Sequence, residues 1–206
     1  MSRPLRVAVL ASGRGSNLQV LIDRIHGRGK VQIVAVGSDK PQAPALARAE
    51  AAGIETHVFA TADFGGGRSE RDAAIAAWLS GLGVELVVLA GYMQLLGPEL
   101  LERFSGRVIN VHPALLPAFP GLDAVGQALA YGVKVFGVTV HFVDDGVDTG
   151  PIILQEAVAL PNARTREEVF DALHEIEHRL LPRAVGLIAD GAVAPDPEHP
   201  RRVLVR

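Results

Sequence analysis

Residues 5–36, LRVAVLASGRGSNLQVLIDRIHGRGKVQIVAV, decide the fold of this chain. The stretch begins and ends with apolar runs of strand length, residues 5–11 and 31–36, and neither run alternates with polar residues. Such runs are typical of strands that are buried on both faces of a parallel sheet. Between them, leucine and isoleucine recur at helical spacing up to Gly27. A strand, a helix and a second buried strand form a βαβ unit, which predicts a right-handed crossover in a parallel sheet.

The rest of the chain continues this alternation of apolar runs and helical periodicity. Further helices are expected at residues 44–52, 69–82, 98–104 and 122–131, and further strands at 54–59, 84–90 and 108–111. Two extended runs, 135–143 and 152–160, flank a tight turn, so one of them is expected to be antiparallel. Thr165 and Glu168 form a capping-box pattern that starts a long final helix. The sequence therefore predicts an α/β fold: an open, mainly parallel, twisted sheet with helices on both faces and one antiparallel strand.

Composition narrows the domain organisation and the class of function. A chain of 206 residues, 49% of them hydrophobic, supports one core, so we expect a single domain over residues 1–190. Residues 191–206, with Pro195, Pro197 and Pro200, are expected to form an irregular surface tail. The formal net charge of −3 argues against a general nucleic-acid or membrane-surface binder and favours small ligands. The sequence has no cysteine, no signal-peptide pattern and no apolar run of membrane-spanning length, so a cytoplasmic protein is expected.

The loop SGRGSN, residues 12–17, joins the first strand to its helix. Its glycines let backbone N–H groups approach an anion at a helix N-terminus, and Ser16 and Asn17 add side-chain donors. The alternative is a tight turn in which Ser16 only caps the helix. A dinucleotide fingerprint would need a third glycine where Leu18 stands, so the loop favours phosphate binding over NAD binding, although Asp39 imitates a ribose-binding acid.

Asn110 and His112 stand at the end of an apolar strand that Pro113 terminates. Alternate residues of a strand share a face, so both side chains can converge on one substrate group. An amide can stabilise an oxyanion, and an imidazole can donate, accept or transfer a proton near neutral pH. A histidine alone is more often structural, so it is the neighbouring amide that favours a catalytic pair.

The turn DDGVDTGP, residues 144–151, is acidic. Calcium binding has little support, because the EF-hand pattern with its closing glutamate is absent. A solvated acidic turn is the ordinary interpretation. A carboxylate at one strand end can instead hold a histidine at another and stabilise its charged form, which makes Asp148 a candidate partner of His112. His141 is a rival imidazole between two apolar residues, where a structural or polar-face role competes with a catalytic one.

Several ordered motifs resemble the glycinamide ribonucleotide transformylase family. They are SGRGSN at residues 12–17, LAGYM at 89–93, NVHPALLP at 110–117, GVTVHFV at 137–143 and DTGP at 148–151. The resemblance covers residues 5–190, and motifs in order at the family's spacing are more specific than any single motif. It implies a Rossmann-like formyltransferase core that transfers a formyl group from 10-formyltetrahydrofolate to the amine of glycinamide ribonucleotide, in purine biosynthesis. It implies no metal.

The same resemblance implies roles for individual residues. Asn110, His112 and Asp148 would be the catalytic trio, in which Asn110 and protonated His112 stabilise an oxyanion and Asp148 supports proton movement. The substrate would be bound by Gly15, Ser16, Asn17, His174 and Glu177. The folate would be bound by Arg68, Met93, Gln94, Leu95, Leu96, Asn110, Asp144, Asp145, Gly146, Val147 and Asp148. The implied partners are these two small molecules, without nucleic acid or membrane, and the choice between monomer and homodimer stays open.

Three positions limit this transfer of roles. Asp123 stands where many relatives carry a histidine, and His174 stands where glutamine is expected. The glycine-rich stretch before Arg68 leaves Arg71 as a competing choice for the acidic end of the folate.

Four other functions compete with this interpretation. Methionyl-tRNA formyltransferase has a similar core but adds a C-terminal nucleic-acid-binding domain, for which we expect no room in 206 residues. Formyltetrahydrofolate hydrolase has an N-terminal regulatory domain and a second histidine where this chain has Pro113. A nucleotide- or folate-binding module without turnover is disfavoured by the intact catalytic trio. A nicotinamide-dependent oxidoreductase would have to bind its cofactor through residues 13–17.

Overall fold

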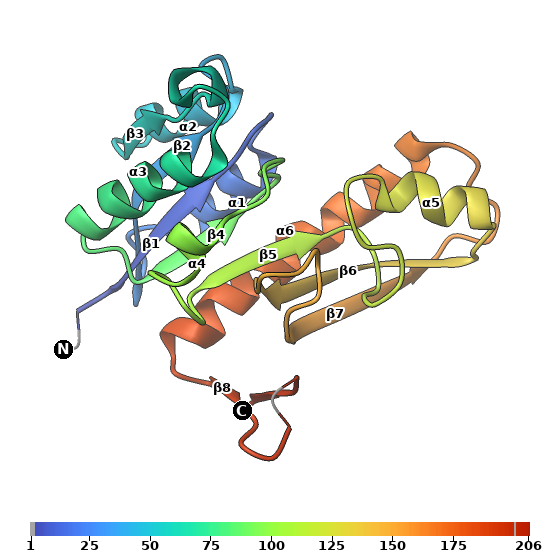
Figure 1. Cartoon of the computed structure of the whole chain (residues 1–206). Coiled ribbons are helices and arrows are strands. Elements are labelled where there is room, and N and C mark those ends of the chain that lie inside the picture. The colour runs from blue at the N-terminus through green and yellow to red at the C-terminus, as the bar shows by residue number, and fades with distance from the viewer. Residues whose placement is uncertain (1–2, 200) are drawn as a thin grey trace. The chain divides into compact units, whose positions relative to one another are not determined.

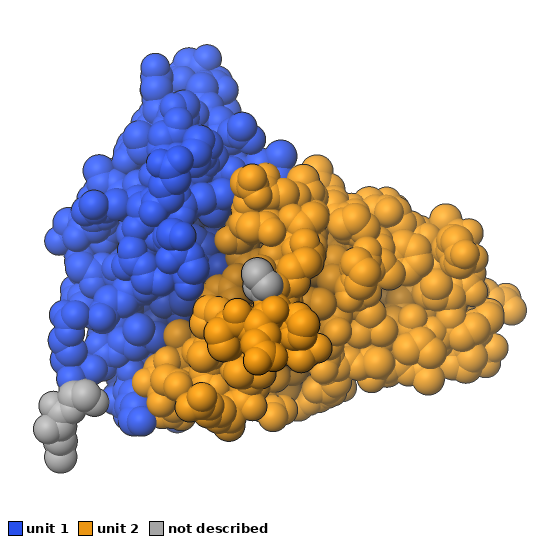
Figure 2. Space-filling view, turned by 60° about the horizontal axis from the view of Figure 1, so that its bottom comes forward, with its two compact units in different colours: residues 1–109 blue, residues 110–206 orange. Residues whose placement is uncertain are grey.

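The computed structural model describes residues 3–199 and 201–206, so Pro200 of the expected tail lies outside the described residues. The chain divides into two compact units, Met1–Ile109 and Asn110–Arg206, which Figure 2 colours blue and orange. The division falls within strand β5 (Val108–His112), so each unit contains part of that strand. Within the described ranges, no helix combines the length and the apolar character needed to cross a membrane.

Unit 1 contains a parallel sheet built from the predicted strands and helices. Its strands are β1 (Leu5–Leu10), β2 (Val31–Ser38), β3 (Glu55–Val58) and β4 (Leu86–Leu89), in the order β3-β2-β1-β4. Its helices are α1 (Ser16–Arg24), α2 (Pro44–Ala51), α3 (Arg68–Gly81) and α4 (Pro98–Leu101), with a 3₁₀ turn η1 (Thr61–Phe64) before α3. All three strand pairs are parallel, and every residue of β4 is buried, as its continuous apolar run predicts.

The helices of unit 1 cover both faces of its sheet. The connections through α1 and α2 run in one direction along the sheet, whereas the connection from β3 through α3 to β4 runs back. Right-handed crossovers therefore place α1 and α2 on one face and α3 on the other, and α1 packs on α2 while α3 packs on α4 (Figure 1). The strand order reverses beside β1, and ligands of open α/β sheets bind outside the carboxyl ends of the strands at such a point.

Unit 2 contains the antiparallel part of the fold. Besides the end of β5 it holds β6 (Val135–Phe142) and β7 (Ile152–Ala159), which pair antiparallel, and the helices α5 (Ala124–Tyr131) and α6 (Arg166–Ala189). Helix α6 packs along both β6 and β7. The capping box is confirmed, because Glu168 N–H donates to Thr165 Oγ1 and the Glu168 carboxylate accepts from Thr165 N–H, both at 3.2 Å. The predicted mainly parallel sheet with an antiparallel strand is also confirmed, because β6 and β7 form its antiparallel pair.

The C-terminal tail is more regular than its prolines suggest. Strand β8 (Val193–Pro195) pairs antiparallel with β9 (Val203–Val205). Pro195 is tolerated at the end of this short edge strand, because no hydrogen-bonded neighbour requires its missing N–H there. The residues just before β9 contact unit 2: Arg201 Nη2 donates to the Thr149 carbonyl oxygen of the acidic turn at 2.6 Å, and Arg202 forms an isolated bridge with Ile152 at the start of β7.

Candidate active site

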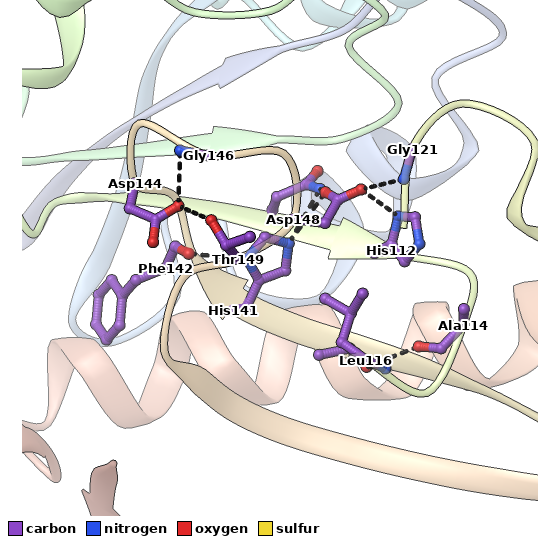
Figure 3. A network of polar contacts seen from close by, with 12 residues as sticks. His112, Ala114, Leu116, Gly121, His141, Phe142, Asp144, Gly146, Asp148 and Thr149 are labelled. Atoms are coloured by element: carbon purple, nitrogen blue, oxygen red, sulfur yellow. Dashed lines mark hydrogen bonds and ion pairs between the residues drawn. The ribbon is translucent and has the colours of Figure 1, made fainter. Parts of the chain in front are cut away.

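Strand β5 carries the two polar side chains that the sequence singles out. Asn110 is half-buried, and His112 is only 4% exposed. Both contact one carboxylate, that of Asp148: Asn110 Nδ2 lies 3.4 Å from its Oδ1, and His112 Nδ1 lies 3.3 Å from its Oδ2. The structure therefore brings the three predicted catalytic residues into one network within unit 2. Figure 3 shows His112 and Asp148 of this network.

Asp148 is presented by a structured loop rather than by a solvated turn. Asp144 Oδ1 accepts hydrogen bonds from the Thr149 hydroxyl at 2.6 Å and from Gly146 N–H at 3.2 Å, so this carboxylate folds the loop. Asp148 itself has a φ of 53°, a left-handed conformation that is costly for a residue other than glycine. In the described part of the chain, no three histidine, aspartate or glutamate side chains are arranged to hold a metal ion.

The surroundings of Asp148 keep its carboxyl group ionised. Burial alone would raise the pKa of this group, but other contacts outweigh it. A hydrogen bond with His141, another from Gly121 N–H at 2.8 Å, and the positive charge of a protonated His112 hold the pKa below its usual 3.8. At neutral pH the network therefore contains a fixed negative charge beside His112.

Both ring nitrogens of His112 face oxygen atoms. Nδ1 faces the Asp148 carboxylate, and Nε2 lies 2.9 Å from the carbonyl oxygen of Phe119. A carbonyl oxygen only accepts hydrogen bonds, so Nε2 carries a hydrogen, and Nδ1 also donates when the ring is protonated. The imidazolium form satisfies both contacts, and it is the form that can direct a charged N–H at a developing oxyanion.

His141 belongs to the same network, although its sequence position left its role open. It is 1% exposed, and its Nε2 lies 3.3 Å from Asn110 Nδ2 and 3.5 Å from Asp148 Oδ1. In Figure 3, Asp148 lies between the rings of His112 and His141. His141 Nδ1 lies 2.8 Å from the carbonyl oxygen of Phe142, which places a hydrogen on Nδ1. The only signal in the sequence was a polar residue between the apolar Val140 and Phe142, and no spacing indicates that it meets Asp148.

The amide of Asn110 is held by long contacts. Its Nδ2 lies 3.3 Å from His141 Nε2 and 3.4 Å from Asp148 Oδ1, and both distances are beyond the usual range for N–H donors. Long catalytic hydrogen bonds are common in ligand-free sites and shorten only when substrate is bound. The Asn110 amide is therefore oriented by the network and can exchange one of these partners for a substrate oxygen.

The loop after β1 leads into α1 without a side-chain cap. Helix α1 starts at Ser16 itself, and Gly15 is the N-cap residue, so the interpretation of Ser16 as the N-cap is wrong. Gly15 has a φ of 73°, and a Cβ there would lie 2.8 Å from Ala45, so both the conformation and the close approach require glycine. No side chain caps this helix within the described residues. Its first-turn N–H groups therefore provide the donors that an anion site needs.

Helix α6 carries the remaining predicted substrate residues. Glu177 is buried, and His174 is half-buried. The His174 ring stacks with Phe170 and His178, with ring centroids 5.8 and 6.2 Å apart. A spacing of three residues makes His174 and Glu177 neighbours on the helix surface. The aromatic stack gives His174 a defined position that the expected glutamine would not share.

The structure separates the two arginines that compete for the folate. Arg71 is 2% exposed, and its guanidinium is bonded to Asp72 inside unit 1. Arg68 is exposed at the first residue of α3. Only the guanidinium of Arg68 is therefore accessible to an acidic ligand group.

Asp123 has a structural role at the start of α5. It is the N-cap residue of α5 and accepts a hydrogen bond from Gly126 N–H at 3.3 Å. Its carboxylate also pairs with Arg166, whose Nη2 donates to Asp123 Oδ2 at 2.7 Å. The hydrogen bond with Arg166 is the main reason why the pKa of this exposed carboxyl is lowered. Asp123 thus joins the starts of α5 and α6.

Known proteins resemble this chain over most of its length. A family model described as formyl transferase matches residues 5–185. Phosphoribosylglycinamide formyltransferase of Bacillus subtilis (strain 168) is 43% identical over 181 residues, which cover 87% of this chain and 92% of that protein. The trifunctional purine biosynthetic protein adenosine-3 of Homo sapiens is 43% identical over 189 residues, 91% of this chain and 19% of that protein. The crystal structure of glycinamide ribonucleotide transformylase 1 from Symbiobacterium toebii superposes with a TM-score of 0.94 at 44% identity, covering 100% of this chain and 95% of that one.

Proposed function

Because the chain belongs to the formyl transferase family, we propose that it transfers a formyl group from 10-formyltetrahydrofolate to the amine of glycinamide ribonucleotide through Asn110, His112 and Asp148. The substrates and the place in purine biosynthesis rest on the names of the relatives. The observation that carries the catalytic assignment is that one ionised carboxylate, Asp148, contacts both the Asn110 amide and the His112 ring.

The reaction forms one bond from nitrogen to carbon and breaks another. The amine nitrogen of glycinamide ribonucleotide attacks the formyl carbon, and the carbonyl electrons move to oxygen to give a tetrahedral oxyanion. The oxyanion collapses, and the bond between the formyl carbon and N10 of the folate breaks. One proton leaves the amine and one reaches N10. The products are the formylated ribonucleotide and tetrahydrofolate.

Each residue of the trio has one task in this reaction. The His112 N–H that donates to the Phe119 carbonyl in this structure turns to the developing oxyanion, and the Asn110 amide adds a second donor. Asp148 holds the imidazolium in place and accepts the proton that the amine loses, directly or through water. Preorganised donors of this kind typically contribute a factor of about 10² to 10³ in kcat each.

The substrate phosphate is assigned to the start of α1. Gly15, Ser16 and Asn17 supply backbone and side-chain donors, and the helix dipole adds to the attraction of an anion. His174 and Glu177 on α6 are assigned to phosphate and ribose contacts. The net charge of −3 does not oppose this assignment, because a helix N-terminus attracts phosphate locally.

The folate is assigned to two segments. Met93 and Leu95 are 53% and 57% exposed, and these apolar side chains, with Gln94 and Leu96, offer contacts to an aromatic ring system. In unit 2 the loop from Asp144 through Asp145, Gly146 and Val147 to Asp148 is assigned to the same ligand, together with Asn110. Arg68 is assigned to the acidic end of the folate, because Arg71 is committed inside unit 1.

Residues 1–190 are taken as one formyltransferase domain, and the match of the family model to residues 5–185 supports a boundary close to 190. Both expected partners are small molecules. We expect the enzyme to act in the cytoplasm and to need neither nucleic acid nor a membrane.

A steady-state assay with purified protein tests the proposal. We expect turnover only when glycinamide ribonucleotide and 10-formyltetrahydrofolate are both present, with formylated product and tetrahydrofolate formed in equal amounts. Binding of both compounds, measured by calorimetry, without transfer would support the non-catalytic binding module instead. A change in NADH or NADPH fluorescence on titration, without formyl transfer, would support the oxidoreductase.

A further inference from the structure

Residues 93–97, here called the 93–97 segment, lie between β4 and α4 and form neither helix nor strand. The segment presents the exposed side chains of Met93 and Leu95. A ligand-binding segment without ladder or helix hydrogen bonds must obtain its shape from other contacts, because buried backbone groups need partners.

Side chains from elsewhere in unit 1 hold the segment at every second residue. Met93 N–H donates to Ser12 Oγ at 2.8 Å. Arg71 Nη2 donates to the Leu95 carbonyl oxygen at 3.0 Å. Gly97 N–H donates to Asp72 Oδ2 at 2.5 Å. Ser12, Arg71 and Asp72 are 4%, 2% and 0% exposed, so the side chain that makes each contact is itself buried.

Arg71 is the centre of this arrangement. Its Nε and Nη2 contact Asp72 Oδ1 at 2.9 and 2.8 Å, and its Nη1 donates to Gln94 Oε1 at 2.9 Å. Gln94 Nε2 in turn donates to Asp39 Oδ2 at 3.0 Å, and Asp39 is also buried. One guanidinium therefore fixes the side chain of Gln94, the carbonyl of Leu95 and the carboxylate that holds Gly97.

A buried ion pair alone is weak support for stability, because desolvation offsets much of the attraction between the charges. The contacts of this pair also end on the 93–97 segment, on Gln94, Leu95 and Gly97, rather than only on the helix that carries it. Arginine is suited to this task, because its planar guanidinium directs several donors at fixed angles. The guanidinium of Arg71 can therefore donate to the Gln94 side chain and the Leu95 carbonyl at the same time.

We propose that Arg71 is a positioning residue for folate binding, which it supports by fixing the backbone of the 93–97 segment from beneath. The inference rests on the proposed function, which assigns the folate to Met93, Gln94, Leu95 and Leu96. Arg71 does not touch the ligand, so its replacement changes the affinity for the folate and leaves the binding of glycinamide ribonucleotide intact.

The test compares Arg71→Lys with Arg6→Lys by steady-state kinetics and hydrogen exchange. Arg6 is the matched control, because its Nε and Nη2 also donate to a backbone carbonyl of unit 1, that of Leu82, away from the segment. For Arg71→Lys we expect the KM for 10-formyltetrahydrofolate to rise about tenfold, equivalent to about 1.4 kcal/mol, and the KM for glycinamide ribonucleotide to change less than about twofold. In the ligand-free protein, the amides of Met93 and Gly97 should exchange faster in Arg71→Lys than in Arg6→Lys.

Ser12→Ala provides a second variant in case Arg71→Lys does not fold. It removes only the acceptor of the Met93 N–H, so it should raise the KM for the folate in the same direction by a smaller factor. Unchanged folate KM and unchanged exchange in both variants would overturn the positioning role. That outcome differs from failure of the proposed function, in which the unmodified protein itself would neither bind 10-formyltetrahydrofolate nor transfer its formyl group.

Discussion

Replacement of Asp148 by asparagine removes the negative charge of this residue and keeps the size of its side chain. Asparagine fills the same volume and can still accept the hydrogen bond from Gly121 N–H. It removes the negative charge that lies 3.3 Å from His112 Nδ1. The variant therefore tests whether the imidazolium of His112 depends on an ionised partner.

The magnitude follows from the distance. Coulomb's law with an effective dielectric constant of about 20 gives about 5 kcal/mol for two unit charges 3.3 Å apart. The charges are shared over two carboxylate oxygens and the imidazole ring, so we take about 3 kcal/mol, which corresponds to roughly a 10²-fold loss of kcat. The contact of Asp148 with His141 at 3.5 Å adds to this loss.

The assay is kcat at saturating concentrations of both substrates, measured over a range of pH. We expect Asp148→Asn to lose roughly two orders of magnitude in kcat and to show an altered pH–rate profile. Asp123→Asn is the control, because this exposed carboxylate pairs with Arg166 and takes no part in the trio; its kcat should stay within about twofold. A kcat for Asp148→Asn within threefold of the unmodified enzyme, with the same pH profile, would refute the charge coupling.

Three further predictions concern the same structure. Because the pKa of Asp148 is lowered in the folded protein, its charge stabilises the fold above the usual 3.8 and this contribution is lost as pH falls through the lowered value. Chemical denaturation should therefore show a free energy of unfolding that falls more steeply between about pH 5 and pH 3 in the unmodified protein than in Asp148→Asn, and equal slopes would contradict this. His141→Asn keeps a donor for the Phe142 carbonyl but loses the Nε2 contacts, so kcat should fall about tenfold while stability changes little; normal kcat would remove His141 from the network. Gly15→Ala should lower the melting temperature and raise the KM for glycinamide ribonucleotide, because alanine meets both a φ of 73° and Ala45; kinetics like those of the unmodified enzyme would argue against the phosphate site at α1.

The parts of the fold that could be predicted are those with a strong local pattern. The apolar runs that became β1, β2 and β4 and the Thr165 capping box were readable, because burial on both faces and helix capping each leave a signature in the sequence. The ribbon of β8 and β9 was not readable. Its pairing joins two short segments among prolines, and only their contact across the loop makes them strands.

The candidate site was predictable where one strand carries it. Asn110 and His112 follow from alternation along β5, whereas their meeting with Asp148 depends on where a distant loop ends. The contact between His141 and that carboxylate depends on β6, whose pairing with β7 shifts register at this residue. No spacing in the sequence specifies such a shift.

The separation of Arg68 from Arg71 also required the structure. Both arginines lie in the first turns of α3, and their sequence context is equally polar. Only the placement of Asp72 and of the 93–97 segment shows that one guanidinium is buried and the other exposed. Burial of a charged side chain depends on tertiary partners, so composition alone does not reveal it.

The most direct test of the central claim is the single-turnover rate of formyl transfer by His112→Ala. Single turnover separates the chemical step from product release, and a folded variant that binds both substrates isolates the role of the imidazole. We expect a rate at least about 10²-fold below that of the unmodified enzyme, because the developing oxyanion loses its charged donor. A rate close to normal, in a variant with unchanged affinity for both substrates, would contradict the assignment of the active site to Asn110, His112 and Asp148.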